Sequence, residues 1–344
     1  LGDVYKRQQS RFIQLNFLAS PLVQHGSIEA TTICYVLSAE QQYMMEADRH
    51  VLGFVGLGVM GEPMCRNLAR KSGQRVIAYD LRAEPLARLA DDGVETAASL
   101  ADLAGRADII FMSLPGEPQV RAVAQGEGGL IGLMAQGKTL VDTSTCPVSL
   151  ARELAEECEA KGIDFADAPV ARTAQAAIDG TLSIMVGGRS DVFSRIEPML
   201  YCMGDAITHC GPVGAGEAVK LMNNMVVVQT VHAIAEALAV AQASGAVDGK
   251  ILFETIAKSS GDSFVLRNHG MKSMLPDTHP TQSFPVDYIK KDLSYALQLA
   301  EDCGVKMEGA EATMGLLDRA AGMGFGDRYY TILIKALQGV KSET

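Results

Sequence analysis

The chain has 344 residues, of which 48% are hydrophobic and 21% charged, and its 30 Lys and Arg against 41 Asp and Glu give a net charge of −11. This is the composition of a folded protein with room for two domains, and a negative charge without a local basic patch argues against a nucleic-acid-binding protein. Seven scattered cysteines with no C-x-x-C spacing predict reduced thiols in a cytoplasmic protein and no metal site.

Residues 1–50 are expected to be a non-native or disordered extension. LGDVYKRQ resembles translated adaptor sequence, and no regular hydrophobic period follows it. Gln14 and Asn16 interrupt the apolar run FIQLNFLASPLVQ, which disfavours a signal peptide. Met44 or Met45 is therefore the expected start of the native chain.

Six short apolar runs predict buried strands, and helical periods lie between the early ones. The runs are 51–56, 75–80, 107–114, 138–144, 163–169 and 182–188, and the clearest helical periods are 60–73 and 149–162. Alternation of this kind predicts a mostly parallel sheet covered by helices on both faces, an α/β Rossmann-like domain over residues 51–212.

After residue 212 the strand signals stop, and the pattern predicts an all-α domain over 213–344. Its expected helices are 215–244, 248–258, 284–303 and 307–322. The apolar stretch 225–247 contains Gln229, His232 and Glu236, so it indicates a long buried helix and not a membrane span. Its apolar surface exceeds what one small helical domain covers, which predicts a homodimer or homotetramer.

A G-x-G-x-x-G pattern follows the first predicted strand and opens a helix, and Asp80 ends the second strand 19 residues beyond Gly61. In this context the pattern is typical of dinucleotide binding, with pyrophosphate at the helix N-terminus. Asp80 would bind the ribose hydroxyls and repel a 2′-phosphate, so NAD is favoured; Arg82 leaves NADP open. The predicted cofactor-binding residues here are Gly56, Leu57, Gly58, Val59, Met60, Gly61 and Asp80.

Asn223 and Asn224 lie three and four residues after Lys220, so all three lie near one face of the helix predicted over 215–244. Polar groups there need partners, and a substrate can be one. A desolvated lysine beside another cation, such as Arg172, would have a lowered pKa suited to a general acid or base. The alternative is a solvated lysine with capping amides.

Five segments in order resemble the signature blocks of the β-hydroxyacid dehydrogenase family. They are GFVGLGVMGEPM, DTSTCP (142–147), DAPV…DGTLSIMVGG (167–188), GAGEAVKLMNN (214–224) and KKDLSYAL (290–297). The resemblance implies a metal-independent NAD(P) oxidoreductase that interconverts 3-hydroxy acids and semialdehydes. It also implies that Lys220 is the catalytic lysine and Asn224 its helper, that Leu114, Pro115 and Thr145 contact the cofactor, and that Lys291 closes over it.

One block departs from the family pattern, because Ala171-Arg172-Thr173 stands where many members have Ser-Gly-Gly. This stretch resembles the 3-sulfolactaldehyde reductase branch. With Asn223, these three residues are the predicted substrate-binding residues, and Arg172 is expected to grip a sulfonate or carboxylate. The alternative is that Arg172 pairs with a structural carboxylate such as Asp179.

Two classes of function remain open at this point. The first is a reductase of a short acidic aldehyde of the 3-hydroxyisobutyrate, tartronate-semialdehyde or sulfolactaldehyde type. The second is a protein that binds NAD and a metabolite without turnover. Lys220, Asn224 and Lys291 together favour the enzyme, because binding alone needs no proton donor.

Overall fold

The computed structural model describes residues 50–281 and 284–339. Its sheet has nine strands in the order β3-β2-β1-β4-β5-β6-β8-β7, with β9 paired to β8. Neighbours from β3 to β6 are parallel, β8 is antiparallel to β6 and β7, and β9 is parallel to β8. The strands are β1 (Val51–Val55), β2 (Arg75–Tyr79), β3 (Glu95–Thr96), β4 (Ile109–Met112), β5 (Thr139–Asp142), β6 (Asp164–Asp167), β7 (Val170–Ala171), β8 (Leu182–Gly188) and β9 (Gly204–Gly211).

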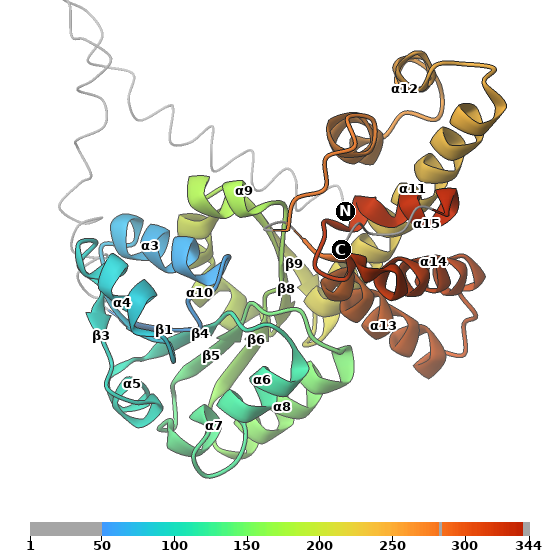
Figure 1. The fold of residues 1–344 in the computed structure, drawn as a ribbon. Helices are drawn as coiled ribbons and strands as arrows, with labels where there is room; N and C mark the ends of the chain where they lie inside the picture. The colour runs from blue at the N-terminus through green and yellow to red at the C-terminus, as the bar shows by residue number, and fades with distance from the viewer. Residues whose placement is uncertain (1–49, 282–283, 340–344) are drawn as a thin grey trace, which may run out of the picture. The chain divides into compact units, whose positions relative to one another are not determined.

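Helices cover both faces of this sheet (Figure 1). They are α3 (Gly61–Lys71), α4 (Ala83–Ala90), α5 (Leu100–Arg106), α6 (Glu117–Ala124), α7 (Leu130–Leu133), α8 (Val148–Ala160), α9 (Ala174–Asp179) and α10 (Ser190–Met203). Successive side chains of a strand point to opposite faces, so β1 contributes to two cores. Phe54 packs with α3 and α10, whereas Val55 packs with α5 and α8.

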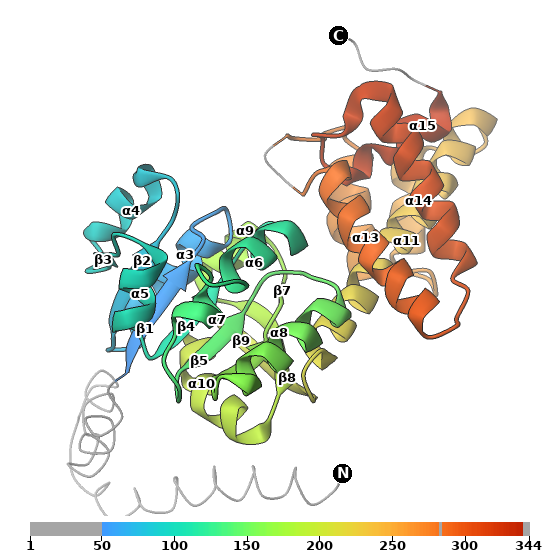
Figure 2. The ribbon, with the colours of Figure 1, turned by 90° about the horizontal axis from the view of Figure 1, so that it is seen from below.

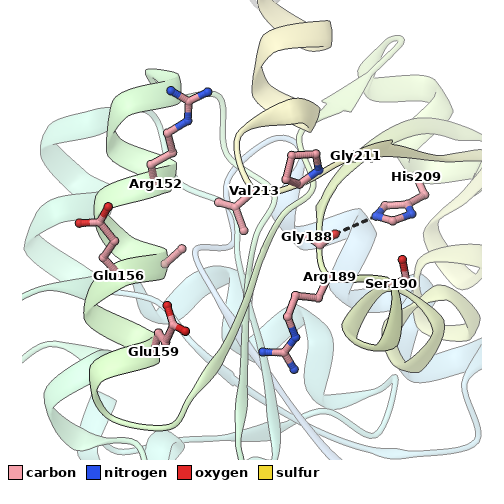
Figure 3. A pocket seen from close by; sticks show the side chains of 11 residues that line it. Arg152, Glu156, Glu159, Gly188, Arg189, Ser190, His209, Gly211 and Val213 are labelled. Carbon is pink, nitrogen blue, oxygen red and sulfur yellow. Dashed lines mark hydrogen bonds between the residues drawn. The ribbon is translucent and has the colours of Figure 1, made fainter.

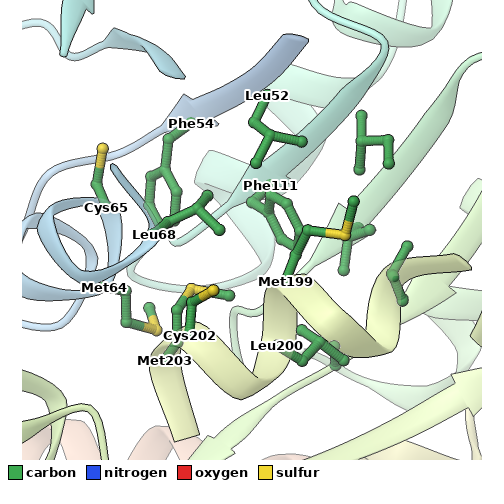
Figure 4. Close-up of a cluster of buried hydrophobic side chains, with 14 of the residues drawn as sticks. Leu52, Phe54, Met64, Cys65, Leu68, Phe111, Met199, Leu200, Cys202 and Met203 are labelled. Carbon is green, nitrogen blue, oxygen red and sulfur yellow. The ribbon is translucent and has the colours of Figure 1, made fainter. Parts of the chain in front are cut away.

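The core on the α3 and α10 side is built from large side chains of the central strands (Figure 4). Phe54 and Phe111 stack with ring centroids 6.3 Å apart, and Leu68 of α3 and Met199 of α10 close over them. Burial of such side chains stabilises the fold by roughly 1.5–3 kcal/mol each. This core fixes the edge of the sheet from which the β1–α3 turn emerges.

The expected fold class is confirmed. Each of the six strand runs contains a strand, and the periods 60–73 and 149–162 are α3 and α8. The sequence reading missed β9, whose residues GDAITHCG have little apolar alternation, and the very short β3 and β7. These strands form through pairing with neighbours and not through local pattern.

The C-terminal half of the described chain is helical, and Figure 2 shows α13, α14 and α15 gathered around α11. It consists of α11 (Ala215–Ser244), α12 (Gly249–Ile256), the π-helix η1 (Leu266–Met274), α13 (Val286–Asp302), α14 (Glu308–Ala320), the π-helix η2 (Ala321–Phe325), the 3-10 helix η3 (Tyr330–Ile332) and α15 (Leu333–Gln338). Leu221, Val228 and Leu238 of α11 form its core with Phe253 and Leu293. The four predicted helices are confirmed, and η1 was not anticipated.

By length and composition alone, α11 could cross a membrane; it is the one such helix among the described residues. It also carries Glu217, Lys220 and Asn224, all of them buried against other elements of the protein. One part of α11 thus carries buried ionisable groups that have protein partners, and another part packs in an apolar core. This combination is typical of a core helix in a globular protein.

The expected extension, residues 1–50, lies outside the described residues except for His50. The backbone N–H of His50 donates a hydrogen bond to Gln74 Oε1 at 3.0 Å. The six cysteines in the described part of the chain are free thiols.

Candidate active site

The β1–α3 turn has the geometry that its three glycines predict. Gly56 has φ 89°, a left-handed conformation that favours glycine, and a side chain there would meet the Ser113 carbonyl oxygen. A side chain on Gly61 would collide with the Gly56 carbonyl oxygen, whereas one on Gly58 would enter open space. No described side chain caps the N-terminus of α3. Gly58 and the free amides of α3 therefore leave room for a pyrophosphate.

Asp80 is tied to this turn. Its Oδ2 accepts a hydrogen bond from Leu57 N at 2.6 Å, and its Oδ1 accepts from Arg82 N at 2.8 Å. Arg82 Nη2 donates to Leu57 O at 3.0 Å. Partial burial opposes ionisation, but these hydrogen bonds outweigh it and lower the pKa of Asp80. An ionised carboxylate thus ends β2 beside the glycine turn, and Val59 and Met60 flank that turn.

Lys220 lies on the buried face of α11, with 8% of its surface exposed. Burial lowers its pKa; Asp292 and Glu217 oppose that shift, and Lys291 adds to it. The sequence analysis had suggested Arg172 as the cation near Lys220. In the structure, the cation that lowers the pKa of Lys220 is Lys291. A lysine of this kind can exchange a proton nearer to neutral pH than an exposed lysine can.

Lys291 of α13 joins the helical half to two loops of the N-terminal half, those of Pro115 and Thr145. Its Nζ donates to Pro115 O at 2.7 Å and to Thr145 O at 3.5 Å, and it lies 4.1 Å from the centre of the Tyr288 ring. Leu114 N donates to Ser144 Oγ at 2.9 Å, which holds the same two loops together. The predicted residues Leu114, Pro115, Thr145 and Lys291 are thus neighbours.

Asp292 connects the two lysines with the predicted helper amide. It is 1% exposed, its Oδ2 accepts from Asn224 Nδ2 at 2.7 Å, and its Oδ1 lies 3.2 Å from Lys291 Nζ. Asn223 is exposed, and its Nδ2 donates to Asn224 Oδ1 at 3.2 Å. Asn224 is therefore oriented by fixed partners, while Asn223 stands at the outer edge of the group.

Sequence reasoning missed three further buried carboxyl groups beside these lysines, those of Asp142, Asp167 and Glu217. Asp167 accepts from Gly214 N at 2.7 Å and from Glu217 N at 2.9 Å, and so caps α11. Burial raises the pKa of Asp142 and of Asp167 to about 6, and that of Glu217 well above its ordinary value. A signal was available, because Asp142 and Asp167 end parallel strands.

The loop predicted to bind the substrate's acidic group has internal partners. Arg172 has φ 86° and is exposed; its Nη1 donates to Thr181 O and, at 2.6 Å, to Asp205 Oδ1. The carboxylate partner is thus Asp205 and not Asp179. Thr173 caps α9 through Ala176 N, and Ala171 is buried in β7. Among the described contacts, none joins this loop to Lys220 or Asn224.

A separate groove of about 670 Å³ lies between α8 and the ends of β8 and β9 (Figure 3). Arg152 and Arg189 stand on opposite sides of it, and His209 Nε2 is 2.8 Å from Gly188 O. Its lining contains none of the predicted site residues. Across residues 50–281 and 284–339, no group of three or more His, Cys, Asp or Glu side chains is arranged to hold a metal ion.

Comparison with known proteins places these features. Residues 51–211 match the model for the NAD binding domain of 6-phosphogluconate dehydrogenase, and residues 214–337 match that for the NAD-binding region of NADP-dependent 3-hydroxyisobutyrate dehydrogenase. The chain is 34% identical to 2-(hydroxymethyl)glutarate dehydrogenase of Eubacterium barkeri, over 83% of this chain and 93% of that one. It is also 34% identical to 2-hydroxy-3-oxopropionate reductase of Escherichia coli, over 83% and 97%.

A solved structure of Mycobacterium tuberculosis 3-hydroxyisobutyrate dehydrogenase with L-serine superposes with a TM-score of 0.76 at 28% identity, covering 84% of this chain and 99% of that one. With the glycine turn and the helical half, these matches define an NAD(P)-dependent oxidoreductase. The chain belongs to the β-hydroxyacid dehydrogenase family. Its relatives are named as enzymes, which counts against the alternative of a binding protein without turnover.

Proposed function

We propose that this enzyme is NAD-dependent and interconverts a short 3-hydroxy acid, or the corresponding sulfonate, and its semialdehyde, with Lys220 as general acid and base. The single observation that carries the proposal is the buried ammonium of Lys220 among Asp292, Glu217 and Lys291. An ordinary structural lysine on a core helix would extend its ammonium to solvent. The ammonium of Lys220 is buried instead, close to Lys291, which donates to the loops that we propose contact the cofactor.

Each residue has a proposed task. In reduction, the Nζ–H bond of Lys220 breaks as the carbonyl oxygen of the substrate gains the proton, and in oxidation the neutral amine takes that proton back. A bound nicotinamide supplies or accepts the hydride. Asn224, fixed by Asp292, donates to the same oxygen. Lys291, whose Nζ donates to Pro115 O and Thr145 O, closes over the cofactor.

The preference for NAD rests on the contacts of Asp80. Its carboxylate is ionised and fixed by Leu57 N and Arg82 N, so a 2′-phosphate at the ribose would meet a negative charge. The guanidinium of Arg82 is bound back to Leu57 O and Asp80. We expect a higher kcat/KM with NADH than with NADPH. The substitution Asp80→Ala should bring the two values of kcat/KM closer together. A wild-type preference for NADPH would contradict this assignment.

Ala171, Arg172 and Thr173, with Asn223, are proposed to bind the acidic end of the substrate. The support for this is that Arg172 and Thr173 are exposed, and that Arg172 engages one nitrogen, Nη1, in its described hydrogen bonds. A substrate anion would compete with Asp205 for this guanidinium. The substrate would then carry a carboxylate or a sulfonate at the end that meets Arg172.

Steady-state kinetics with a panel of acidic aldehydes tests the proposed function. Lys220→Met should lower kcat by about 100-fold or more, the contribution of a positioned general acid, and leave NADH binding in place. Lys290→Met is the control, because it removes a lysine that precedes Lys291 on α13 and has no proposed role in the reaction. Lys290 Nζ pairs with Asp318 Oδ1 at 2.9 Å. Turnover by Lys220→Met at the wild-type rate would reject Lys220 as the proton donor.

We further propose that residues 51–212 and 213–344 are separate domains and that the enzyme is a cytoplasmic homodimer or homotetramer. The oligomer is supported by Val219, Val226 and Val240, which are 45%, 57% and 67% exposed on α11. Their spacings of 7 and 14 residues place them on one face. Light scattering should give at least twice the chain mass, and Val226→Asp with Val240→Asp should give a monomer. A wild-type monomer at micromolar concentration would contradict the proposal.

A further inference from the structure

Glu217 is a buried acid that the proposed reaction does not use. It lies in the first turn of α11 and is 1% exposed. Its Oε1 accepts a hydrogen bond from Cys146 N at 3.1 Å, and its Oε2 has no hydrogen-bond partner among the described residues. A buried oxygen without a partner costs about 1–3 kcal/mol of folding free energy. Stability therefore does not account for a carboxyl group at this position.

Charged groups from several elements face Glu217. Asp142 lies at the end of β5, Asp167 at the end of β6, and Asp292 on α13. Burial is the largest cause of the raised pKa of Glu217, and each of these three carboxyl groups raises it further. Cys146 N opposes them. The cations of the group are Lys220 on α11 and Lys291 on α13. The site thus holds four buried carboxyl groups against two ammonium groups.

Glu217 and Lys220 influence one another directly. They are three residues apart on one helix, a spacing that puts their Cβ atoms about 5–6 Å apart. The negative charge of Glu217 raises the pKa of Lys220, against the effect of burial. Two groups that interact in this way titrate as a pair, so the charge of one depends on whether the other holds its proton.

We propose that Glu217 is a positioning residue that sets the pH range in which Lys220 keeps its proton. Once Glu217 has released its proton to solvent, the negative charge that remains favours the protonated form of Lys220. The pH range in which Lys220 is the proton donor for reduction thereby extends to higher pH. This inference rests on the proposed role of Lys220 as general acid and base.

The pH dependence of kcat/KM in both directions tests the inference. Reduction needs the ammonium of Lys220 and is lost as pH rises, whereas oxidation needs the amine and is lost as pH falls. Without the charge of Glu217, Lys220 loses its proton at lower pH. Glu217→Gln, which preserves an acceptor for Cys146 N, should therefore move both limits to lower pH by about one unit or more.

Two further variants separate charge from packing. Glu217→Leu leaves Cys146 N without its acceptor but also removes the unpartnered Oε2, so its two effects on the free energy of unfolding oppose one another. It should move the pH limits as far as Glu217→Gln does. Glu236→Gln removes an exposed glutamate from the same helix and should move neither limit. A shift in the Leu variant alone would assign Glu217 to packing and overturn the proposal.

The outcome is distinguishable from a failure of the proposed function. If Lys220→Met retains turnover with the wild-type pH limits, Lys220 is not the proton donor and the proposed function fails. If Lys220→Met is inactive and Glu217→Gln keeps the wild-type limits, the proposed function stands and the inference about Glu217 is rejected.

Discussion

The β1–α3 turn and the lysine site are built in opposite ways. The turn uses Gly56, Gly58, Gly61 and Asp80, which lie within 24 positions of one another, and its binding groups are mostly backbone amides. The lysine site draws its charged groups from β5, β6, α11 and α13, and all of them except the half-buried Lys291 are buried. A short motif can encode the first, because glycine geometry is local. The second exists only when distant elements have packed.

The two regions also differ in how they tolerate change. The turn depends on space, so a single added methyl group tests it. The lysine site depends on charge balance among groups that are each costly to bury alone. Substitutions that alter charge should therefore disturb the lysine site most, and substitutions that alter volume should disturb the turn most.

The largest effect is expected at Asp292. Asp292→Ala removes the partner of both Asn224 and Lys291 and should lower the free energy of unfolding by about 3–5 kcal/mol, the cost of leaving a buried charge unpaired. Asp302→Ala, at an exposed position of the same helix, should cost less than about 0.5 kcal/mol. Chemical denaturation measures both values. Equal losses of unfolding free energy in Asp292→Ala and Asp302→Ala would mean that the charges around Asp292 do not stabilise one another.

A smaller effect is expected in the glycine turn. Gly61→Ala places a methyl group against the Gly56 carbonyl oxygen and should lower the free energy of unfolding by about 1–3 kcal/mol. Gly58→Ala enters open space and should leave stability unchanged, but weaken NADH binding about tenfold, which is about 1.4 kcal/mol. Fluorescence titration and thermal unfolding measure the two quantities. A Gly58→Ala protein that binds NADH normally would place the cofactor elsewhere.

The smallest effect is expected at Arg172. If its guanidinium binds the substrate's acidic group, Arg172→Ala should raise KM for an acidic aldehyde about tenfold, the loss of one hydrogen bond to a charged group. KM for a neutral aldehyde should not change. Asp205→Ala frees the same guanidinium and should leave KM unchanged or lower it. Equal increases in both variants would assign the Arg172–Asp205 pair to structure alone.

The sequence predicted the parts of the molecule that have a local period or motif. The buried strands, the helix over 215–244 and the glycine turn all follow from spacing along the chain. Lys291 was found only through family resemblance, because nothing in KKDLSYAL shows that one lysine reaches Pro115. Glu217 was missed because a glutamate in a first helical turn is ordinarily a solvated residue. Its burial depends on Cys146 and Asp167, which come from distant strands and loops.

Arg172 illustrates the same limit in a loop. Its partner Asp205 lies on β9, a strand that the sequence pattern did not reveal. A nearby acid, Asp179, was the natural alternative from spacing, but its carboxylate accepts from Gln175 Nε2. Pairing across a sheet edge is set by tertiary structure, and separation along the chain does not predict it.

A crystal structure of the enzyme with NADH and an unreactive analogue of an acidic aldehyde tests the account most directly. The quantity to measure is the distance from Lys220 Nζ to the oxygen that would carry the proton. We predict about 3 Å, within hydrogen-bond reach of a general acid. A bound analogue whose reacting oxygen faces another donor, with Lys220 Nζ turned away from it, would contradict the account.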